Sequence, residues 1–462
     1  MSTLPLPLAL TPENRDTTNL KDARLVNGFW ERKGEKEYDY FKRAGVGSYS
    51  NLGGAQVGHG VFNWNGVVVA IAGTHFYTLA ASVPTAQGVV VAPTWTVSPM
   101  QGNLAATPQL LINNGGGNGY YWDSTTLHTI GGFPANTVPG AVYLDETMYV
   151  MDIKSQIWAS GLEDLATWAG GDYVTAYIEP GKGVALYKQL VYVVAFKNTS
   201  VEVFYDAAAT PNPLGPVQGA KVNFGCAHAG SIQDIDGKLI WICTSKSGAY
   251  GIMQMENVQA AAISTPAVNR LLQGADFTGN VYSWQAVVGG HQLYGVTLKS
   301  SNLTLVYDLT SKMWAEWSVA GSYFPIVASC AGPNQEILMQ HESDGYIYKL
   351  DPLTSVDAWS SGTVTIQLDM YTPNWNPGGE LGVLYNQMQV DADLQLGSVL
   401  QMRFSDDDYK TWSGFYNLDL GRKNPTVDDL GSAQRRAFNF RHASPTPFRL
   451  KGVKMRIDIC TL

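Results

Sequence analysis

Residues 60 to 351 repeat one pattern of apolar and polar positions. A polar or glycine-rich turn precedes an apolar alternating segment, and after a second turn comes another segment that ends near an aromatic residue. Alternation with a period of two places one face of a strand in a core, so each copy predicts a β-hairpin. The copies are residues 63–79, 109–124, 142–160, 184–206, 232–253, 286–308 and 336–351.

The spacing of these hairpins indicates how they assemble. Successive copies start about 30 to 55 residues apart, near the blade period of a β-propeller, which is about 40–50 residues. A lone hairpin is only marginally stable, and radial packing of four-stranded sheets buries both faces. Residues 307–317, YDLTSKMWAEW, follow a strand with a turn and a tryptophan-bearing strand, as kelch-type blades do. We predict an irregular all-β propeller of six or seven blades, with a long β-sandwich or solenoid as the alternative.

The pattern changes near residue 353. The predicted strands become longer and the turns fewer, as in residues 363–373, 384–405, 437–442 and 448–459. We therefore divide the chain into a propeller, residues 46–352, and a C-terminal β-sandwich or platform, residues 353–462. Residues 1–45 are too charged and too short to fold alone. We expect them to be an arm that docks on the platform or on a neighbouring subunit.

The segment RFSDDDYKTWSG, residues 403–414, nearly matches the Asp box, S-x-D-x-G-x-T-W, of sialidase-like hairpins. The matching positions are Ser405, Asp407, Thr411 and Trp412. Tyr409 stands where the box has glycine. The box is a structural device in which the aspartate caps the turn and the tryptophan packs under the hairpin. We expect the same here, with Asp406 and Asp408 in a solvated turn.

Composition supports an all-β chain without a targeting segment. Hydrophobic residues make up 45% of the 462 positions, charged residues only 15%, and there are 48 glycines for turns. The four cysteines have no metal-site spacing and are expected to be reduced thiols: Cys226, Cys243, Cys330 and Cys460. The start MSTLPLPLAL lacks the basic region of a signal peptide, and no apolar run is long enough to span a bilayer. We expect synthesis in a cytoplasm.

Charge is distributed unevenly along the chain. Residues 44–402 hold 11 basic and 25 acidic side chains, whereas residues 403–462 hold 11 basic and 7 acidic ones. An acidic middle argues against a grip on nucleic acid, because duplex binding depends on Lys and Arg. Arg270 is the one arginine between Arg43 and Arg403. A sialidase needs several convergent guanidinium groups for its substrate carboxylate, so that activity is excluded.

Other catalytic patterns are weak. A glycosidase would use two facing carboxylates, for which Asp145, Glu163, Asp234 and Asp308 are candidates, although 25 scattered acids form pairs by chance. In QDIDGKL, Asp234 and Asp236 are expected to be turn residues. The sequence lacks a complete phosphate loop, an HExxH pair and a nucleophile elbow. We therefore expect no enzyme activity, no cofactor and no metal.

Four segments, in order along the chain, share features with one known family. Residues 22–50 contain Asp22, the pair Val26–Asn27, and Phe41 to Gly45, where Ala44 stands in place of a proline. Later segments are residues 145–168, 184–207 and 435–459, and in residues 184–207 the match lies at Phe196, the corner Ser200 to Glu202, and Tyr205. Together these segments resemble the packaged-DNA stabilization proteins of short-tailed phages, the tail hub or nozzle family, and residues 22–50 are similar to the N-terminal signature of that family.

The resemblance implies a propeller with an added β-platform and a structural role in the virion. Such proteins form a ring of six below the portal, close the filled head, let double-stranded DNA pass on ejection, and carry fibres, spikes or a needle. The expected partners are thus five further copies, portal or adaptor proteins, and other tail proteins. The expected location is the virion tail, after assembly in the host bacterial cytoplasm.

The candidate ring or platform contacts are basic or polar residues near the two ends of the chain, and they are Asn27, Lys42, Arg43, Arg435, Arg436 and Arg441. An acidic channel wall would repel DNA phosphates, and basic ends could meet acidic patches on neighbouring proteins. Two other functions stay open: a carbohydrate-binding or glycan-degrading tail propeller, and a kelch-like interaction scaffold.

Overall fold

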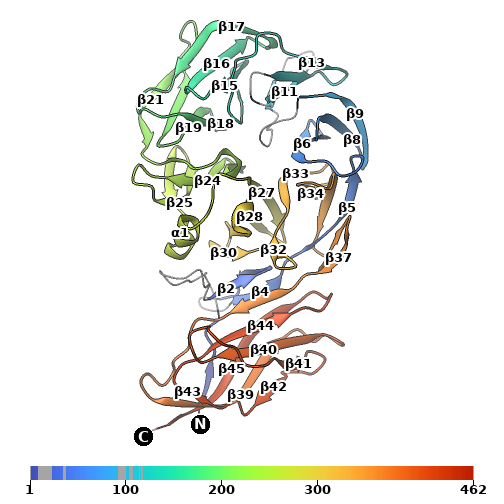
Figure 1. Ribbon diagram of the computed structural model, residues 1–462, viewed down its shortest axis with the longest axis vertical. Helices are drawn as coiled ribbons and strands as arrows, with labels where there is room; N and C mark the ends of the chain where they lie inside the picture. Colours follow the sequence, from blue (N-terminus) through green and yellow to red (C-terminus); the bar gives the residue numbers. More distant parts are fainter. Residues whose placement is uncertain are drawn as a thin grey trace.

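The computed structural model describes residues 2–8, 23–34, 38–91, 100–102, 108–113, 115 and 118–460. Sheets arranged around a centre form a propeller, and a platform of two sheets lies beneath it (Figure 1). The chain is almost entirely β, as the sequence predicts. The one α-helix in the described part is α1, Pro266–Gln273, which Thr265 caps at its N-terminus.

Six propeller sheets are built from consecutive strands of the chain. The first three are β6 (Gly58–Trp64) to β9 (Val83–Val89) with β7 (Val67–Ala72) and β8 (His75–Ala80); β10 (Met100–Gly102) to β13 (Leu127–Thr129) with β11 (Gln109–Asn113) and β12 (Gly119–Trp122); and β14 (Val142–Leu144) to β17 (Asp164–Thr175) with β15 (Thr147–Met151) and β16 (Gln156–Gly161).

The next three sheets continue in the same way. They are β18 (Gly183–Gln189) to β21 (Leu214–Val222) with β19 (Tyr192–Lys197) and β20 (Val201–Asp206); β22 (Gly225–Cys226) to β26 (Gln259–Ala262) with β23 (Gln233–Ile235), β24 (Lys238–Thr244) and β25 (Tyr250–Glu256); and β27 (Val281–Val288) to β30 (Met313–Glu316) with β28 (His291–Leu298) and β29 (Leu303–Asp308).

A composite sheet closes the circle. It contains β33 (Ile326–Ala331), β34 (Ile337–His341) and β35 (Tyr346–Asp351), and its fourth strand is β5 (Gly45–Asn51) from the N-terminal part of the chain. The strand β5 runs antiparallel to β35, from Gly45 opposite Asp351 to Asn51 opposite Tyr346. In Figure 1 it is the blue strand beside the orange ones. The described residues thus form seven propeller sheets, within the predicted range.

Side-chain amides link neighbouring propeller sheets. The Nε2 of Gln340 in β34 donates to the Ile71 carbonyl at 2.9 Å, and its Oε1 accepts from the Gly60 amide. Asn113 donates to the carbonyls of Val138 and Gly140 in the same manner. These bonds satisfy backbone groups where strands of different sheets meet, so the circle is held by polar contacts as well as by apolar packing.

The platform consists of two packed sheets. One has the order β3 (Gly28–Arg32), β4 (Tyr38–Lys42), β45 (Arg449–Cys460), β39 (Gly382–Ala392), β42 (Thr426–Asp428), with β1 (Ser2–Pro5) on β45 and β43 (Ser432–Ala433) on β39. The other has the order β2 (Arg24–Val26), β38 (Leu368–Tyr371), β44 (Ala437–His442), β40 (Val399–Ser405), β41 (Tyr416–Asp419). The described part of residues 1–45 therefore supplies β1 to β4 of the platform sheets.

The propeller and the platform share a sheet. Strand β2 pairs antiparallel with β38 and, through Val26 opposite Glu316, parallel with β30 of the propeller. Two short hairpins lie near this joint. One is β31 (Ser318–Val319) with β32 (Ser322–Tyr323), and the other is β36 (Val356–Trp359) with β37 (Gly362–Thr365). A continuous apolar core fills the space between the two platform sheets and contains Leu25, Trp30, Met388 and Phe440.

The Asp box between β40 and β41 forms as the sequence predicts. The Asp407 carboxylate accepts from the amides of Lys410 and Thr411 at 3.1 and 2.9 Å and from both neighbouring hydroxyl groups. Trp412 packs edge-on against Tyr371, with ring centroids 5.7 Å apart. The flanking acids are partly exposed, as expected for a solvated turn, and each also forms an ion pair that the sequence did not predict. Asp406 pairs with Arg436 and Asp408 pairs with Arg435.

Tyr409 occupies the glycine position of the box with the backbone that glycine would have. Its φ is 64°, in the left-handed region that costs a non-glycine residue about 1–2 kcal/mol. The side chain offsets this strain because it is buried and its hydroxyl donates to the Thr372 carbonyl at 2.8 Å. The tyrosine thus anchors the hairpin to β38.

We expect Tyr409→Gly to lower the free energy of unfolding although it restores the Asp box. Relief of the left-handed backbone gains about 1 kcal/mol, whereas loss of a buried aromatic ring costs about 3–5 kcal/mol. Denaturant unfolding should show a net loss of about 2–4 kcal/mol. Tyr409→Phe keeps the ring and should lose only about 1 kcal/mol. A glycine variant as stable as the parent would show that the ring does not anchor the hairpin.

Candidate functional site at the junction of propeller and platform

Arg43 lies between β4 and β5, where the chain passes from the platform into the propeller. Its side chain is buried, and its five N–H groups find five acceptors. Two go to the Asp357 carboxylate at 2.9 and 2.6 Å, and the others go to the Asn27 side chain and the carbonyls of Ala44 and Ser318. A guanidinium fork is the side chain that can bind a carboxylate in two places and three further oxygens at once.

Asn27 supports this arginine from β2. It adopts a left-handed backbone, with φ of 57°, which asparagine tolerates better than most residues. Its Oδ1 accepts from Arg43 Nε at 2.9 Å and from the Ser318 amide at 2.8 Å, while its Nδ2 donates to the Gln367 carbonyl. Two residues that the sequence analysis selected separately are therefore in direct contact.

A polar cavity of about 640 Å³ lies beside these residues. It is bounded by β2, by the segment from the end of β30 to β32, and by β37 and β38. Among its lining side chains are Arg24, Asn27, Glu316, Asp357, Asp369 and Tyr371. Its lining comes from both parts of the chain, with Glu316 on the propeller side and Asp369 on the platform side.

Lys42 is buried at the seam between β4 and the end of β44. Its Nζ donates to the Ser444 carbonyl at 2.7 Å and lies 3.5 Å from Nδ1 of His442. Burial, with the nearby charge of Arg43, lowers the pKa of Lys42 to about 7. Burial also lowers the pKa of His442 to about 3, so this ring is neutral at physiological pH.

A Ser–His pair adjoins Lys42, but it is closed to substrate. Ser398 Oγ lies 2.8 Å from His442 Nε2, a distance found in nucleophile–base pairs. Ser398 and His442 have no exposed surface, and the histidine ring stacks on Phe448 at a centroid distance of 4.4 Å. The cluster therefore holds the arm strand on the platform.

The three C-terminal arginines lie in different environments. Arg436 is buried, donates to both oxygens of Asp406 at 2.6 and 2.8 Å, and lies over the Phe404 ring at 3.8 Å. Arg441 donates from Nε to Asp369 at 2.9 Å and is about one quarter exposed. Arg435, which pairs with Asp408, keeps half of its side chain exposed.

These placements separate the six candidate contacts into two groups. Asn27, Lys42, Arg43 and Arg436 are buried, and the partners described above belong to the same chain. Arg43 and Asn27 join the propeller to the platform, whereas Lys42 and Arg436 join segments within the platform. The role of the six residues in contacts between subunits stays a prediction. Arg441 is partly exposed, and Arg435 has the most exposed side chain of the two.

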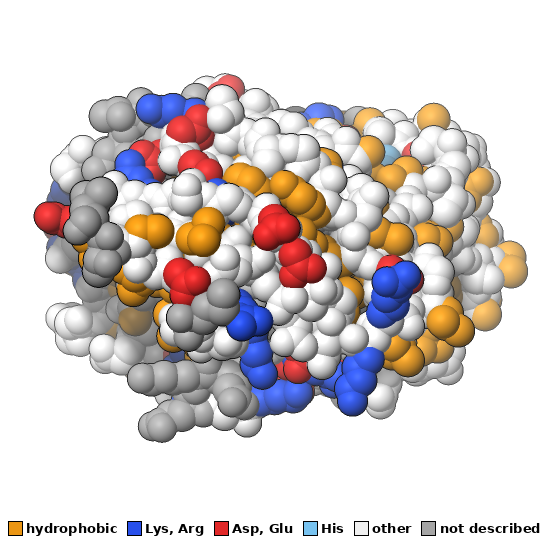
Figure 2. Space-filling model, turned by 90° about the horizontal axis from the view of Figure 1, so that it is seen from below, with side chains coloured by type: hydrophobic (Ala, Val, Ile, Leu, Met, Phe, Trp, Pro, Cys, Tyr) orange, Lys and Arg blue, Asp and Glu red, His pale blue; other side chains and the backbone are white. Residues whose placement is uncertain are grey.

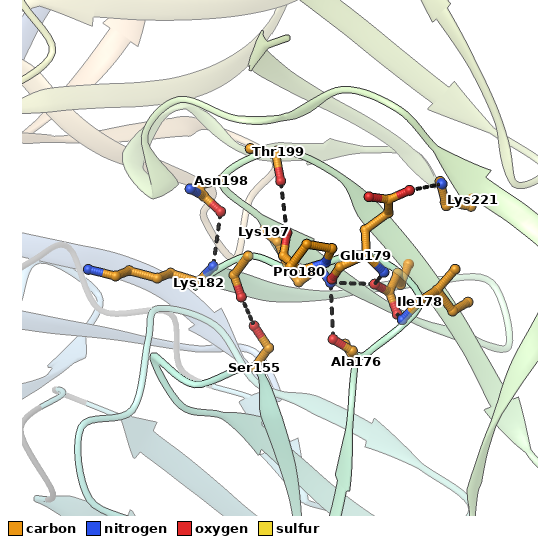
Figure 3. Close-up of polar contacts among 12 residues, drawn as sticks. Ser155, Ala176, Ile178, Glu179, Pro180, Lys182, Lys197, Asn198, Thr199 and Lys221 are labelled. Carbon is orange, nitrogen blue, oxygen red and sulfur yellow. Dashed lines mark hydrogen bonds and ion pairs between the residues drawn. The ribbon is translucent and has the colours of Figure 1, made fainter. Parts of the chain in front are cut away.

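The corner Ser200 to Glu202 also forms a defined structure, between the third and fourth propeller sheets. Lys197 and Glu202 are both fully buried and ion-paired, and Lys197 donates to the Ala176 carbonyl at 3.0 Å. Glu202 accepts from the amides of Ile178 and Glu179 at 3.2 and 3.1 Å. Figure 3 shows Glu179 reaching outward to Lys221. The pair fixes the segment that connects β17 to β18.

The four candidate carboxylates have structural surroundings. Asp234 accepts from the Gly237 amide at 2.9 Å, which confirms the turn expected there. Asp308 is buried and accepts from Ser311 and Thr310 while lying 2.7 Å from His291 Nδ1. Asp145, with φ of 42°, and Glu163, with φ of 49°, have left-handed backbones next to strand ends.

The sequence analysis did not identify the acids that pair with Arg43, Arg436 and Arg441. Asp357, Asp369 and Asp406 lie 314, 72 and 30 residues from their partners Arg43, Arg441 and Arg436. No local pattern marks such a contact. The one signal in the sequence is an arginine inside an apolar strand pattern. Such an arginine is expected to be buried, and a buried guanidinium needs a carboxylate partner.

We expect Arg43→Lys to lower the free energy of unfolding by about 3 kcal/mol, because one ammonium group cannot replace five donors at a buried site. The matched control is Arg435→Lys, whose half-exposed ion pair should change stability by no more than about 0.5 kcal/mol. Denaturant unfolding of both variants measures the difference. Equal effects at the two sites would contradict the role assigned to Arg43.

The lowered pKa of Lys42 predicts a pH dependence of stability. Between about pH 7 and 10 the unfolded chain keeps a proton that the folded chain has released, so the free energy of unfolding rises with pH. The slope from one such group is at most about 1.4 kcal/mol per pH unit. Lys42→Met should flatten this slope when unfolding is measured at pH 7, 8 and 9. An unchanged slope would show that Lys42 is protonated in the folded chain.

The described residues were also examined for metal-binding clusters and for helices that could span a membrane. No group of three or more His, Cys, Asp or Glu side chains in the described part is placed to hold a metal ion. No helix among those residues has the length and apolar character needed to cross a membrane.

Solved structures resemble the chain only distantly. The N-terminal domain of Nup159 has a TM-score of 0.40 at 9% identity and covers 71% of this chain and 99% of its own. BamB from Moraxella catarrhalis has a TM-score of 0.40 at 12% identity, with 76% of this chain and 96% of its own covered. The designed protein Ika8 has a TM-score of 0.40 at 10% identity and covers 66% and 100%. A search of curated proteins finds no match.

A protein-family model gives a specific result. Residues 21–355, more than two thirds of the chain, match the model described as "Bacteriophage P22 Gp10, beta-propeller". The match begins at the arm that contains Asn27 and Arg43 and ends just before the β36–β37 hairpin, which contains Asp357. It therefore includes both the propeller and the strands that join it to the platform. The chain belongs to this phage stabilisation family of structural proteins.

Proposed function

We propose that this protein is the tail hub, or nozzle, of a short-tailed phage. Six copies form a ring that closes the DNA-filled head, lets the duplex pass on ejection, and anchors other tail proteins. The family match over residues 21–355 carries this proposal. The partners above the ring are portal or adaptor proteins, and those outside or below it are fibres, spikes or needle proteins.

The distribution of charge supports a DNA conduit. A channel that conducts a duplex has to repel phosphates weakly rather than bind them, and the propeller portion has a large excess of acids. The platform end presents a band of Lys and Arg side chains in Figure 2, with acids between them. Residues 403–462 of the platform hold 11 basic and 7 acidic side chains, and such a basic segment can meet acidic surfaces of neighbouring proteins, which favours a fixed orientation in a ring.

The arrangement of the junction supports a structural rather than a catalytic role. The buried Arg43, Lys42 and Arg436 bond to groups within the chain and join its parts. A rigid joint of this kind suits a protein that transmits load between a head and a tail. The described carboxylates named above serve turns and ion pairs, which gives no support to glycan hydrolysis.

Electron microscopy of the purified protein, with and without its portal or adaptor ring, tests the proposal. We expect six-fold rings with an opening wide enough for a duplex, on the template ring if not in solution. A monodisperse monomer that ignores the template would overturn the hub function. A glycan-binding screen would then examine the alternative of a carbohydrate-binding propeller.

A matched pair of variants refines this experiment. Arg435→Gln removes the most exposed of the candidate contacts, and Arg422→Gln removes an arginine of the same platform whose side chain is 80% exposed. If Arg435 meets a neighbour, its variant should lower ring yield at low salt while the Arg422 variant leaves it unchanged. Equal ring yields from the two variants would show that Arg435 does not contact a neighbouring subunit. That result would not contradict the proposed ring of six copies.

A further inference from the structure

Strand β1 is the outermost strand on one side of β45. Its register places Ser2 opposite Ile457 and Pro5 opposite Lys454. Leu6, next in the chain, is 5% exposed, and Leu4 and Leu8 pack against the same platform core. The segment STLPLPL thus fills an apolar groove beside β45 with every second side chain.

The prolines of this segment determine what the strand can pair with. The Leu6 amide donates to the Val453 carbonyl at 2.9 Å. Because hydrogen-bonding directions alternate along a strand, the backbone amides of the even-numbered positions of this segment face β45. Positions 5 and 7 face the opposite, open side, and both are proline, which has no N–H. Another strand therefore cannot pair well with β1, and a second copy could engage this edge only by replacing β1.

The position of β1 makes such a replacement possible. Both chain ends lie at the end of the platform away from the propeller (Figure 1). Fourteen sequence positions separate Leu8 from Ala23, and a segment of that length spans at most about 50 Å. Detachment of a short terminal strand requires only local opening, which is far less costly than global unfolding.

We propose that Ser2–Leu8 is a donor strand that passes between copies of this chain and enters the groove beside β45 of a second copy. The exchanged contact is identical to the internal one, so the two arrangements differ mainly in the effective concentration of strand and groove. A tethered strand favours its own groove in dilute solution, whereas close neighbours or a vacant groove favour exchange. This exchange requires only two copies and does not depend on the proposed ring.

A pair of engineered cysteines detects the exchange. Thr3 and Arg456 are directly opposite each other in the register and both are exposed. The donor is the full chain with Thr3→Cys and Cys460→Ser, which cannot form this disulfide internally. The acceptor carries Arg456→Cys and Cys460→Ser and lacks residues 2–8, so its groove is vacant. The control acceptor has Thr426→Cys in place of Arg456→Cys, because Thr426 is exposed on the same sheet two strands away from β45.

We expect mild oxidation of the mixture to give at least about tenfold more covalent dimer with the Arg456→Cys acceptor than with the Thr426→Cys acceptor. A donor with the further changes Leu4→Ser and Leu6→Ser should lose this excess. Equal yields from the two acceptors would overturn the proposal, because they would reflect random collision of exposed thiols.

A second acceptor keeps the test valid if removal of residues 2–8 prevents folding. The full-length Arg456→Cys, Cys460→Ser chain retains its own β1, and exchange with it should give fewer dimers whose proportion rises with protein concentration. The double variant Thr3→Cys, Arg456→Cys in one chain should close an internal disulfide in dilute solution. Dimer yields from the full-length acceptor that stay at the Thr426 control level at every concentration would also overturn the proposal.

Discussion

The buried guanidinium of Arg43 is the interaction on which the joint between propeller and platform depends. It lies at the point where the chain leaves β4 for β5, and its acceptors come from the arm, from the propeller hairpin at Ser318 and from the hairpin at Asp357. The arm and the hairpin at Ser318 contribute backbone carbonyls, those of Ala44 and Ser318, and the hairpin at Asp357 contributes a carboxylate. One side chain therefore fixes the relative position of three parts of the chain that are far apart in sequence.

Such a joint is more specific than an apolar contact. Apolar surfaces tolerate small displacements, whereas a two-point Arg–carboxylate pair with three further acceptors has one geometry. The rings of Trp317 and Phe324, at 5.3 and 5.0 Å from the guanidinium carbon, exclude water from it. The shared strand β2 adds continuity of the backbone, since one sheet runs from the propeller into the platform.

Local patterns were sufficient to predict the hairpins and the propeller, because alternation within β7, β19 or β24 is a property of neighbouring residues. The Asp box was equally readable, since its contacts span nine positions or fewer. The pairing of β2 with β38 and of β5 with β35 could not be read from the sequence, because Leu25 pairs with Met370 and Ser48 with Tyr348, about 300 or more residues away along the chain. Lys42 and Arg436 were noticed as charges, but their burial depends on strands that the sequence does not place beside them.

The closure of the propeller by β5 has a consequence for how the chain folds during synthesis. Strand β5 leaves the ribosome early but has no partner until β35 has been made. Strand β2 can pair with β30 before that, but its second partner β38, and β45 beside β4, are made later still. Incomplete chains thus keep open edges at their N-terminal segment and lack a platform altogether. Only a chain translated as far as β45 can complete the platform sheets, so a truncated chain lacks the finished platform surface.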